Sequence, residues 1–132
     1  LDINGRSGPV FEADKHGTLA MLKSLKTGAA LVLLLDLAVG HGIAVNFMGR
    51  RVYCSVTAAS FALKTKALFV PYFSMRNRDG ESFSVEIGTP IEHSDAQTMT
   101  REATKSLEER VHADPGNWFW IHRRWKYCPP TD

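Results

Sequence analysis

Apolar residues recur at helical spacing in three stretches of the chain, residues 18–26, about 57–64 and about 95–112. Gly28 suits the C-terminal cap of the first predicted helix, and Ser55 or Thr57 suits the N-terminal cap of the second. Ser94 or Asp95 begins the third, whose other face carries acids and bases and is predicted to be solvated. Its predicted inner face holds residues four apart: Met99, Ala103, Leu107 and Val111.

Five other stretches predict strands: residues 9–13, 29–35, 43–48, 67–73 and 82–87. The run 29–35 is continuously apolar, which is typical of a central parallel strand buried on both faces. Pro71 indicates an edge or the end of pairing, and Asp79-Gly80 predicts a turn that pairs 67–73 with 82–87. These elements predict a single α/β domain over residues 1–132, with a mixed, mainly parallel sheet and flanking helices.

The composition is that of an ordinary globular domain, 44% hydrophobic and 23% charged. A net charge of +2 confines basicity to local patches and argues against a chain coated by nucleic acid. Cys54 and Cys128 are too few and too far apart for a disulfide framework or a zinc site, and the five histidines lack metal-ligand spacing. There is no phosphate loop, dinucleotide fingerprint, nucleophile elbow or apolar run of bilayer-spanning length. We therefore expect neither a metal nor a cofactor.

Residues 118–126, here called the tryptophan segment, hold all three tryptophans together with His122, Arg123, Arg124 and Lys126. Aromatic rings interleaved with cations suit a membrane interface, where rings settle at headgroup level and bases meet anionic phosphates. They also suit single-stranded nucleic acid, through base stacking and phosphate contacts. The alternative is a last helix that buries its tryptophans in the core and leaves its arginines in water.

Asp36 directly follows the predicted strand 29–35, and the basic pair Arg50-Arg51 follows the predicted strand 43–48. Loops beyond the carboxyl ends of parallel strands line the active crevice of α/β sheets, so Asp36 is a functional candidate. The alternative for Asp36 is a turn cap or an ion pair with a nearby arginine. The cationic groups suit an anionic substrate such as a phosphorylated lipid or a phosphopantetheine carrier.

The segment Asn117–Lys126, Asn-Trp-Phe-Trp-Ile-His-Arg-Arg-Trp-Lys, resembles the C-terminal signature of the bacterial lipid A biosynthesis acyltransferases, which are lauroyl and myristoyl transferases. Residues 19–36 are similar to that family's helix, glycine, apolar strand and Asp-Gln, and residues 45–50 to its Val-x-Phe-Phe-Gly-Arg segment. Further matching pieces are residues 57–65, 68–71, 79–80 and 89–92. The resemblance covers nearly the whole chain and implies part of a glycerolipid-acyltransferase-like α/β domain.

The resemblance implies transfer of a fatty acyl chain from an acyl carrier protein or acyl-CoA thioester to a hydroxyl of a phosphorylated glycolipid, the lipid A precursor. It also implies work at the cytoplasmic face of the bacterial inner membrane, either peripherally or through an N-terminal anchor. By resemblance, Asp36, Arg50 and Thr57 line the acceptor or carrier side of the crevice. The tryptophan segment then faces the membrane or the phosphorylated acceptor through its substrate-binding candidates His122, Arg123 and Arg124.

Two departures from the family pattern change this expectation. The family's general base is a histidine followed, after four residues, by an aspartate or glutamate, whereas His16 and His93 are followed there by Met21 and Thr98. The family's Asp-Gln is Asp36-Leu37 here. The missing motif, and a first residue that is not methionine, lead us to expect the C-terminal part of a longer enzyme that is inactive alone.

Two other functions stay open at this point. A non-catalytic domain for anionic lipid or an acyl carrier would keep the family's ancestry without its chemistry. A nucleic-acid-binding module would use the tryptophans for stacking, although the small net charge leads us not to expect nucleic acid as a partner. A sheet without its N-terminal strands would expose an edge, which allows a homodimer.

Overall fold

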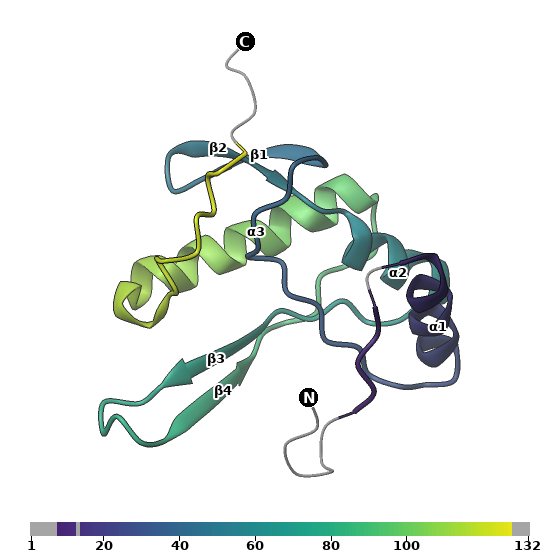
Figure 1. Cartoon of the computed structure of the whole chain (residues 1–132), viewed down its shortest axis with the longest axis horizontal. Helices are drawn as coiled ribbons and strands as arrows, with labels where there is room; N and C mark the ends of the chain where they lie inside the picture. The colour runs from purple at the N-terminus through teal and green to yellow at the C-terminus, as the bar shows by residue number, and fades with distance from the viewer. Residues whose placement is uncertain (1–7, 13, 128–132) are drawn as a thin grey trace. The chain divides into compact units, whose positions relative to one another are not determined.

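The computed structural model of the chain describes residues 8–12 and 14–127. In these residues it contains three α-helices, one short 3-10 helix and two antiparallel sheets of two strands each (Figure 1). By contact density the chain divides into two compact units, Leu1–Val32 and Leu33–Asp132. The predicted mixture of helices and strands is confirmed. The predicted mainly parallel sheet is wrong for the described residues, because both of their strand pairs are antiparallel.

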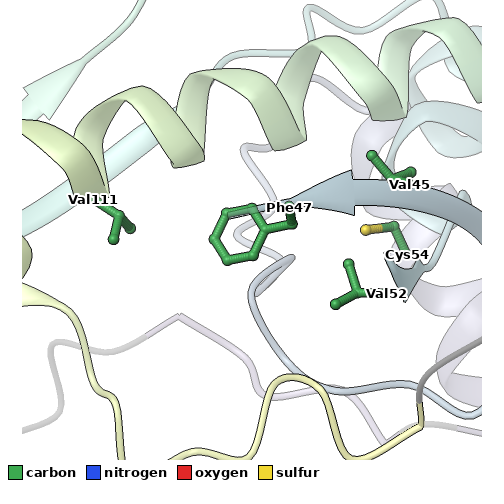
Figure 2. Packing of buried hydrophobic residues seen from close by; sticks show 5 residues of the cluster. All are labelled: Val45, Phe47, Val52, Cys54 and Val111. Atoms are coloured by element: carbon green, nitrogen blue, oxygen red, sulfur yellow. The ribbon is translucent and has the colours of Figure 1, made fainter. Parts of the chain in front are cut away.

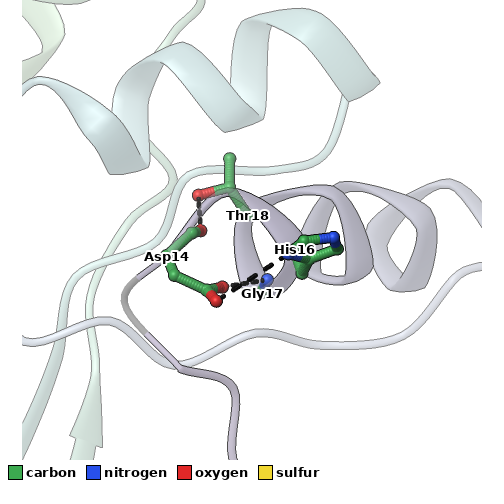
Figure 3. A network of polar contacts seen from close by, with 4 residues as sticks. All are labelled: Asp14, His16, Gly17 and Thr18. Atoms are coloured by element: carbon green, nitrogen blue, oxygen red, sulfur yellow. Dashed lines mark hydrogen bonds and ion pairs between the residues drawn. The ribbon is translucent and has the colours of Figure 1, made fainter.

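Helix α1, Lys15–Lys26, is the element of the first unit, and its start is fixed by Asp14. The Asp14 carboxylate accepts the backbone N–H of Gly17 at 2.7 Å, and the Asp14 carbonyl accepts the Thr18 hydroxyl at 2.7 Å (Figure 3). The helix ends at Lys26, and Gly28 follows with a φ of 87°, as the predicted C-terminal cap requires. Residues 9–12 form no strand, contrary to prediction, and residue 13 lies outside the described residues.

Residues 29–35, predicted as a buried central strand, are extended but belong to no sheet. Val32 is 70% exposed and Leu34 is 69% exposed, so one side of this run faces solvent. The prediction of a strand buried on both faces is therefore wrong. A parallel ladder needs a neighbouring strand reached by a crossover, and residues 8–12 and 14–127 do not provide one.

Strands β1, Ile43–Phe47, and β2, Arg50–Cys54, form a hairpin with a two-residue turn. Met48 and Gly49 both have positive φ, 53° and 73°, which matches the twist of a tight hairpin. The basic pair Arg50-Arg51 follows β1, as predicted, and itself opens strand β2, which the sequence did not predict. Figure 2 shows the hairpin's core side chains, Val45, Phe47, Val52 and Cys54, beneath a long helix, which itself carries Val111.

That long helix is α3, Ala96–Ala113, and a second core joins it to α2, Thr57–Thr65. Asp95 caps α3 by accepting the backbone N–H groups of Gln97 and Thr98 at 2.9 and 3.0 Å. The predicted inner face of α3 is confirmed, since Met99, Ala103 and Val111 are buried and Leu107 packs on the hairpin core. The cap of α2 is Val56, so the predicted caps are wrong; the Ser55 hydroxyl nevertheless accepts the Thr57 N–H at 3.2 Å.

Strands β3, Tyr72–Arg76, and β4, Phe83–Ile87, form the second hairpin, as Asp79-Gly80 predicted. Strand β3 begins later than predicted, after Pro71, and Phe69 makes only an isolated bridge to Ile91. Arg110 of α3 forms an ion pair with Glu86 and lies over the ring of Phe73, 5.7 Å from its centroid. The second hairpin is thus held to α3 mainly by one arginine.

Candidate functional site

The tryptophan segment follows a 3-10 turn, η1, Pro115–Asn117, and is itself a succession of turns. Short-range hydrogen bonds define these turns, among them Arg124 N–H to the His122 carbonyl at 2.7 Å and Lys126 N–H to the Arg123 carbonyl at 3.0 Å. The alternative of a last helix is wrong for residues 118–127. Because the backbone turns repeatedly, neighbouring side chains of the segment have very different burial.

Two tryptophans point inward and pack on Phe47 of β1. The Trp118 ring meets Phe47 edge-on at 5.4 Å between centroids, and the Trp125 ring stacks on Phe47 at 5.9 Å. Trp118 and Trp125 also meet each other edge-on at 5.8 Å. Phe47 itself is fully buried, so these rings close the core of the first hairpin.

Arg124 also points inward and is only 2% exposed. Its Nη1 donates to the carbonyl of Leu37 and, at 3.3 Å, to that of Tyr53, and its Nη2 lies 2.9 Å from the Cys54 Sγ. The guanidinium carbon lies 5.9 Å from the centroid of Phe47. A buried cation needs such partners to offset its lost hydration. Among the described residues the Nε of Arg124 and the Nε1 of Trp125 are buried without a hydrogen-bond partner.

His122 reaches the same loop as Arg124. Its Nε2 accepts the backbone N–H of Ala38 at 2.7 Å, across 84 residues of sequence. An Nε2 that accepts a hydrogen bond carries no proton, so the imidazole in this arrangement is neutral with its proton on Nδ1. His122 and Arg124 therefore hold the loop that directly follows Asp36.

The outward side of the segment is apolar and basic. Phe119 is 65% exposed and Ile121 is 82% exposed, with half-exposed Trp120 between them. The Trp120 indole is fixed, because its Nε1 donates to the Pro115 carbonyl at 2.7 Å. Arg123 and Lys126 are exposed on the same turns. Exposed aromatic and aliphatic side chains beside cations are the pattern expected of an interfacial surface.

The remaining predicted site residues are placed unevenly. Arg50 is exposed and lies 5.7 Å above the Trp125 ring, so the structure brings it to the tryptophan segment. Asp36 is half-buried, and no residue among 8–12 and 14–127 donates a hydrogen bond to its carboxylate. Thr57 is exposed, and its hydroxyl bonds to that of Ser55 at 2.8 Å, with no contact to the other candidates. The binding roles predicted for these residues stay predictions.

The sequence did not indicate the backbone groups of Leu37, Ala38 and Tyr53, which receive His122 and Arg124. No sequence signal pointed to these groups, because a two-residue spacing places side chains on one side only in an extended strand, and the tryptophan segment is a succession of turns. Two further observations concern the described residues only. They contain no cluster of metal-ligating side chains. A pocket of about 400 Å³ lies between the β3–β4 turn and the end of α3 and includes none of the predicted site residues.

The model of the bacterial lipid A biosynthesis acyltransferase family matches residues 6–127, which is nearly all of the chain. The chain belongs to this family. The resemblance carried by the tryptophan segment and the upstream pieces is thereby confirmed. The lipid A acyltransferase match includes every candidate residue, from Asp36 to Arg124.

A lipid A biosynthesis acyltransferase from Haemophilus influenzae is 26% identical over 123 residues, which cover 88% of this chain and 40% of that protein. The chain therefore spans less than half the length of the curated relative that it matches. In residues 8–12 and 14–127, no helix combines the length and the apolar character that crossing a membrane requires.

Proposed function

We propose that this chain supplies the acceptor side and the membrane contact of an enzyme that acylates a lipid A precursor. The reaction transfers a fatty acyl chain from an acyl carrier protein or acyl-CoA thioester to a hydroxyl of the phosphorylated glycolipid. The observation that carries the proposal is the outward side of the tryptophan segment, within a chain that belongs to the lipid A acyltransferase family. The place of action is the cytoplasmic face of the bacterial inner membrane.

The membrane contact follows from the chemistry of the exposed side chains. Phe119, Trp120 and Ile121 offer apolar surface to the headgroup region, and Arg123 and Lys126 offer charge to anionic phosphates. Arg50 adds a cation at the edge of this surface, stacked on Trp125. Such a surface orients the chain on a bilayer that also contains the glycolipid acceptor.

The acceptor side of the proposal concerns Asp36, Arg50 and Thr57. Asp36 has a carboxylate without a hydrogen-bond donor among the described residues, which leaves it available to a ligand hydroxyl. Arg50 and Arg123 are exposed cations that suit the phosphates of the acceptor. Transfer of the proton from the acceptor hydroxyl needs a base, and no histidine of the 132 residues is followed by an acid after four residues. We therefore propose that the chain alone is inactive.

Vesicle binding tests the membrane contact. Wild-type chain should sediment with vesicles of phosphatidylglycerol, less with phosphatidylcholine, and less again as salt is raised. Arg123→Ala with Lys126→Ala should weaken binding to anionic vesicles roughly 30-fold, at about 1 kcal/mol for each basic side chain. The matched control is Lys64→Ala with Lys105→Ala, which removes two exposed lysines of α2 and α3 and should bind like wild type. Equal losses in both double variants would contradict a specific surface.

An acyl-transfer assay tests the chemistry separately. The chain is mixed with acyl carrier protein thioester and a phosphorylated glycolipid acceptor, and no acylated product should form. A longer chain that carries the histidine and acid motif should form product, and Asp36→Asn in it should lower the rate. Product from the 132-residue chain alone would contradict the need for that motif.

A second candidate is a binding domain without chemistry for anionic lipid or an acyl carrier. It is favoured by the one specific observation that the family's histidine and acid motif is absent from the 132 residues. Vesicle or carrier binding together with an inactive longer chain would select this function. A homodimer through an incomplete sheet edge stays a prediction, which sedimentation equilibrium can test.

A further inference from the structure

The two inward polar side chains of the tryptophan segment converge on a single peptide unit. Leu37 contributes the carbonyl and Ala38 the N–H of the peptide that joins them. Arg124 donates to that carbonyl, and His122 accepts from that N–H at 2.7 Å. One peptide unit is thus held by a donor and an acceptor that are themselves two residues apart.

We propose that His122 and Arg124 are positioning residues that fix Asp36 through the Leu37–Ala38 peptide, instead of binding an anionic acceptor themselves. The inference rests on the proposed function in one respect, namely that Asp36 lies beside the acceptor. A peptide unit is planar, so its carbonyl and N–H turn together. Rotation of this plane would break both side-chain hydrogen bonds at once, and the plane shares the Cα of Leu37 with the peptide that joins Asp36 to Leu37.

The burial of Arg124 supports this role. The guanidinium is 2% exposed and lies over Phe47, so it faces the protein core and not the surface. Its other contacts reach Tyr53 and Cys54 of β2, which ties the loop after Asp36 to the first hairpin. By contrast Arg123, the next residue in sequence, is exposed and keeps the surface role. Of the two adjacent arginines, Arg124 thus positions the loop and Arg123 provides surface charge.

Amide NMR of the full chain tests the proposal without lipid or acyl donor. The Ala38 amide shift should change in His122→Ala, which removes the acceptor, and return towards the wild-type value in His122→Gln, whose amide oxygen can accept the Ala38 N–H. His41→Ala is the matched control and should leave the Ala38 amide shift unchanged. An Ala38 amide shift that is the same in wild type and in His122→Ala would overturn the proposal.

The chemical shift of the side-chain carboxyl carbon of Asp36 reports whether His122 and Arg124 position that residue. At pH 8 its chemical shift should change in His122→Ala and return to the wild-type value in His122→Gln. Arg124→Lys should also change it, since one ammonium cannot reach the contacts that the guanidinium makes in the Leu37 loop and on β2. If Arg124→Lys does not fold, the His122 series decides. An Asp36 shift that is unchanged in His122→Ala refutes positioning, whatever vesicle binding or acyl transfer shows.

Discussion

The two hairpins of this member of the lipid A biosynthesis acyltransferase family have the same construction and opposite surroundings. Each pairs two antiparallel strands of five residues. In β1–β2, Phe47 and Val52 are fully buried between α3 and the tryptophan segment. In β3–β4, Phe83, Val85 and Ile87 are exposed, each by more than half of its surface. The local sequence therefore makes either hairpin, and distant residues decide which one becomes core.

The two hairpins differ in the side chains that pack against them. The first receives two indole rings and a buried guanidinium from residues about 70 positions away. The second is linked to the rest of the unit by the Arg110–Glu86 ion pair and by Asn117, whose side chain bonds both backbone groups of Arg76. Polar links of this kind orient a hairpin but bury little apolar area.

Matched phenylalanine substitutions should give the largest contrast between the hairpins. Phe47→Ala removes the ring on which Trp118 and Trp125 pack, so we expect a loss of about 3–5 kcal/mol in the free energy of unfolding. Phe83→Ala removes an exposed ring and should cost less than about 1 kcal/mol. Urea unfolding measures both. Similar losses would show that the exposed face of β3–β4 is covered in solution.

A methyl group at two glycines should sharpen the comparison within the first hairpin. Gly42 has a φ of 133°, and an added Cβ would lie 2.2 Å from the Cys54 carbonyl oxygen. Gly42→Ala should cost roughly 2–4 kcal/mol, as overpacking adds to backbone strain. Gly49 has a φ of 73° with no atom near its Cβ position, so Gly49→Ala should cost only about 1–2 kcal/mol. Thermal unfolding compares them, and a milder effect at Gly42 would contradict the close approach to Cys54.

Acidification should destabilise the turn of the second hairpin, and this is the smallest of the effects that we expect. Hydrogen bonds from the Ser82 hydroxyl and the backbone N–H groups of Ser82 and Glu81 lower the pKa of Asp79 below its usual value. A lowered folded-state pKa means that this stabilisation is present above about pH 4 and is lost as pH falls through the lowered value. The protection factors of the Glu81 and Ser82 amides against hydrogen exchange should therefore fall on acidification below pH 4. Asp79→Asn should remove that pH dependence, and its persistence would assign it to another group.

Local signals predicted the elements that local contacts determine. Asp95 and the four-residue spacing of apolar side chains were sufficient for α3, and Asp79-Gly80 was sufficient for β3–β4. The run 29–35 was wrongly predicted to be a buried strand. Its apolar character indicates that it needs to pack against other segments, but it does not show whether those segments lie among the described residues. Strand β2 was missed because its first two residues are arginines, which favour an interpretation as a loop.

The candidate site shows the same limit. The sequence pointed to Arg50 and to the tryptophan segment, and the structure brings them together. The sequence did not distinguish Arg123 from Arg124, since both carry the same charge at neighbouring positions. Their different burial follows from contacts with Leu37 and Tyr53, which lie 87 and 71 residues from Arg124 in the sequence. Contacts between residues so far apart in the sequence produce no pattern in the local spacing of apolar and polar residues.

The close packing of the indoles also makes the chain its own optical reporter. The rings of Trp118 and Trp120 meet edge-on with centroids 4.7 Å apart, close enough for their excited states to couple and to give a circular-dichroism signal in the near ultraviolet. Trp120 is the exposed indole of the three, so added acrylamide should quench its emission first. Docking on a bilayer would shift that emission to shorter wavelength without any attached dye.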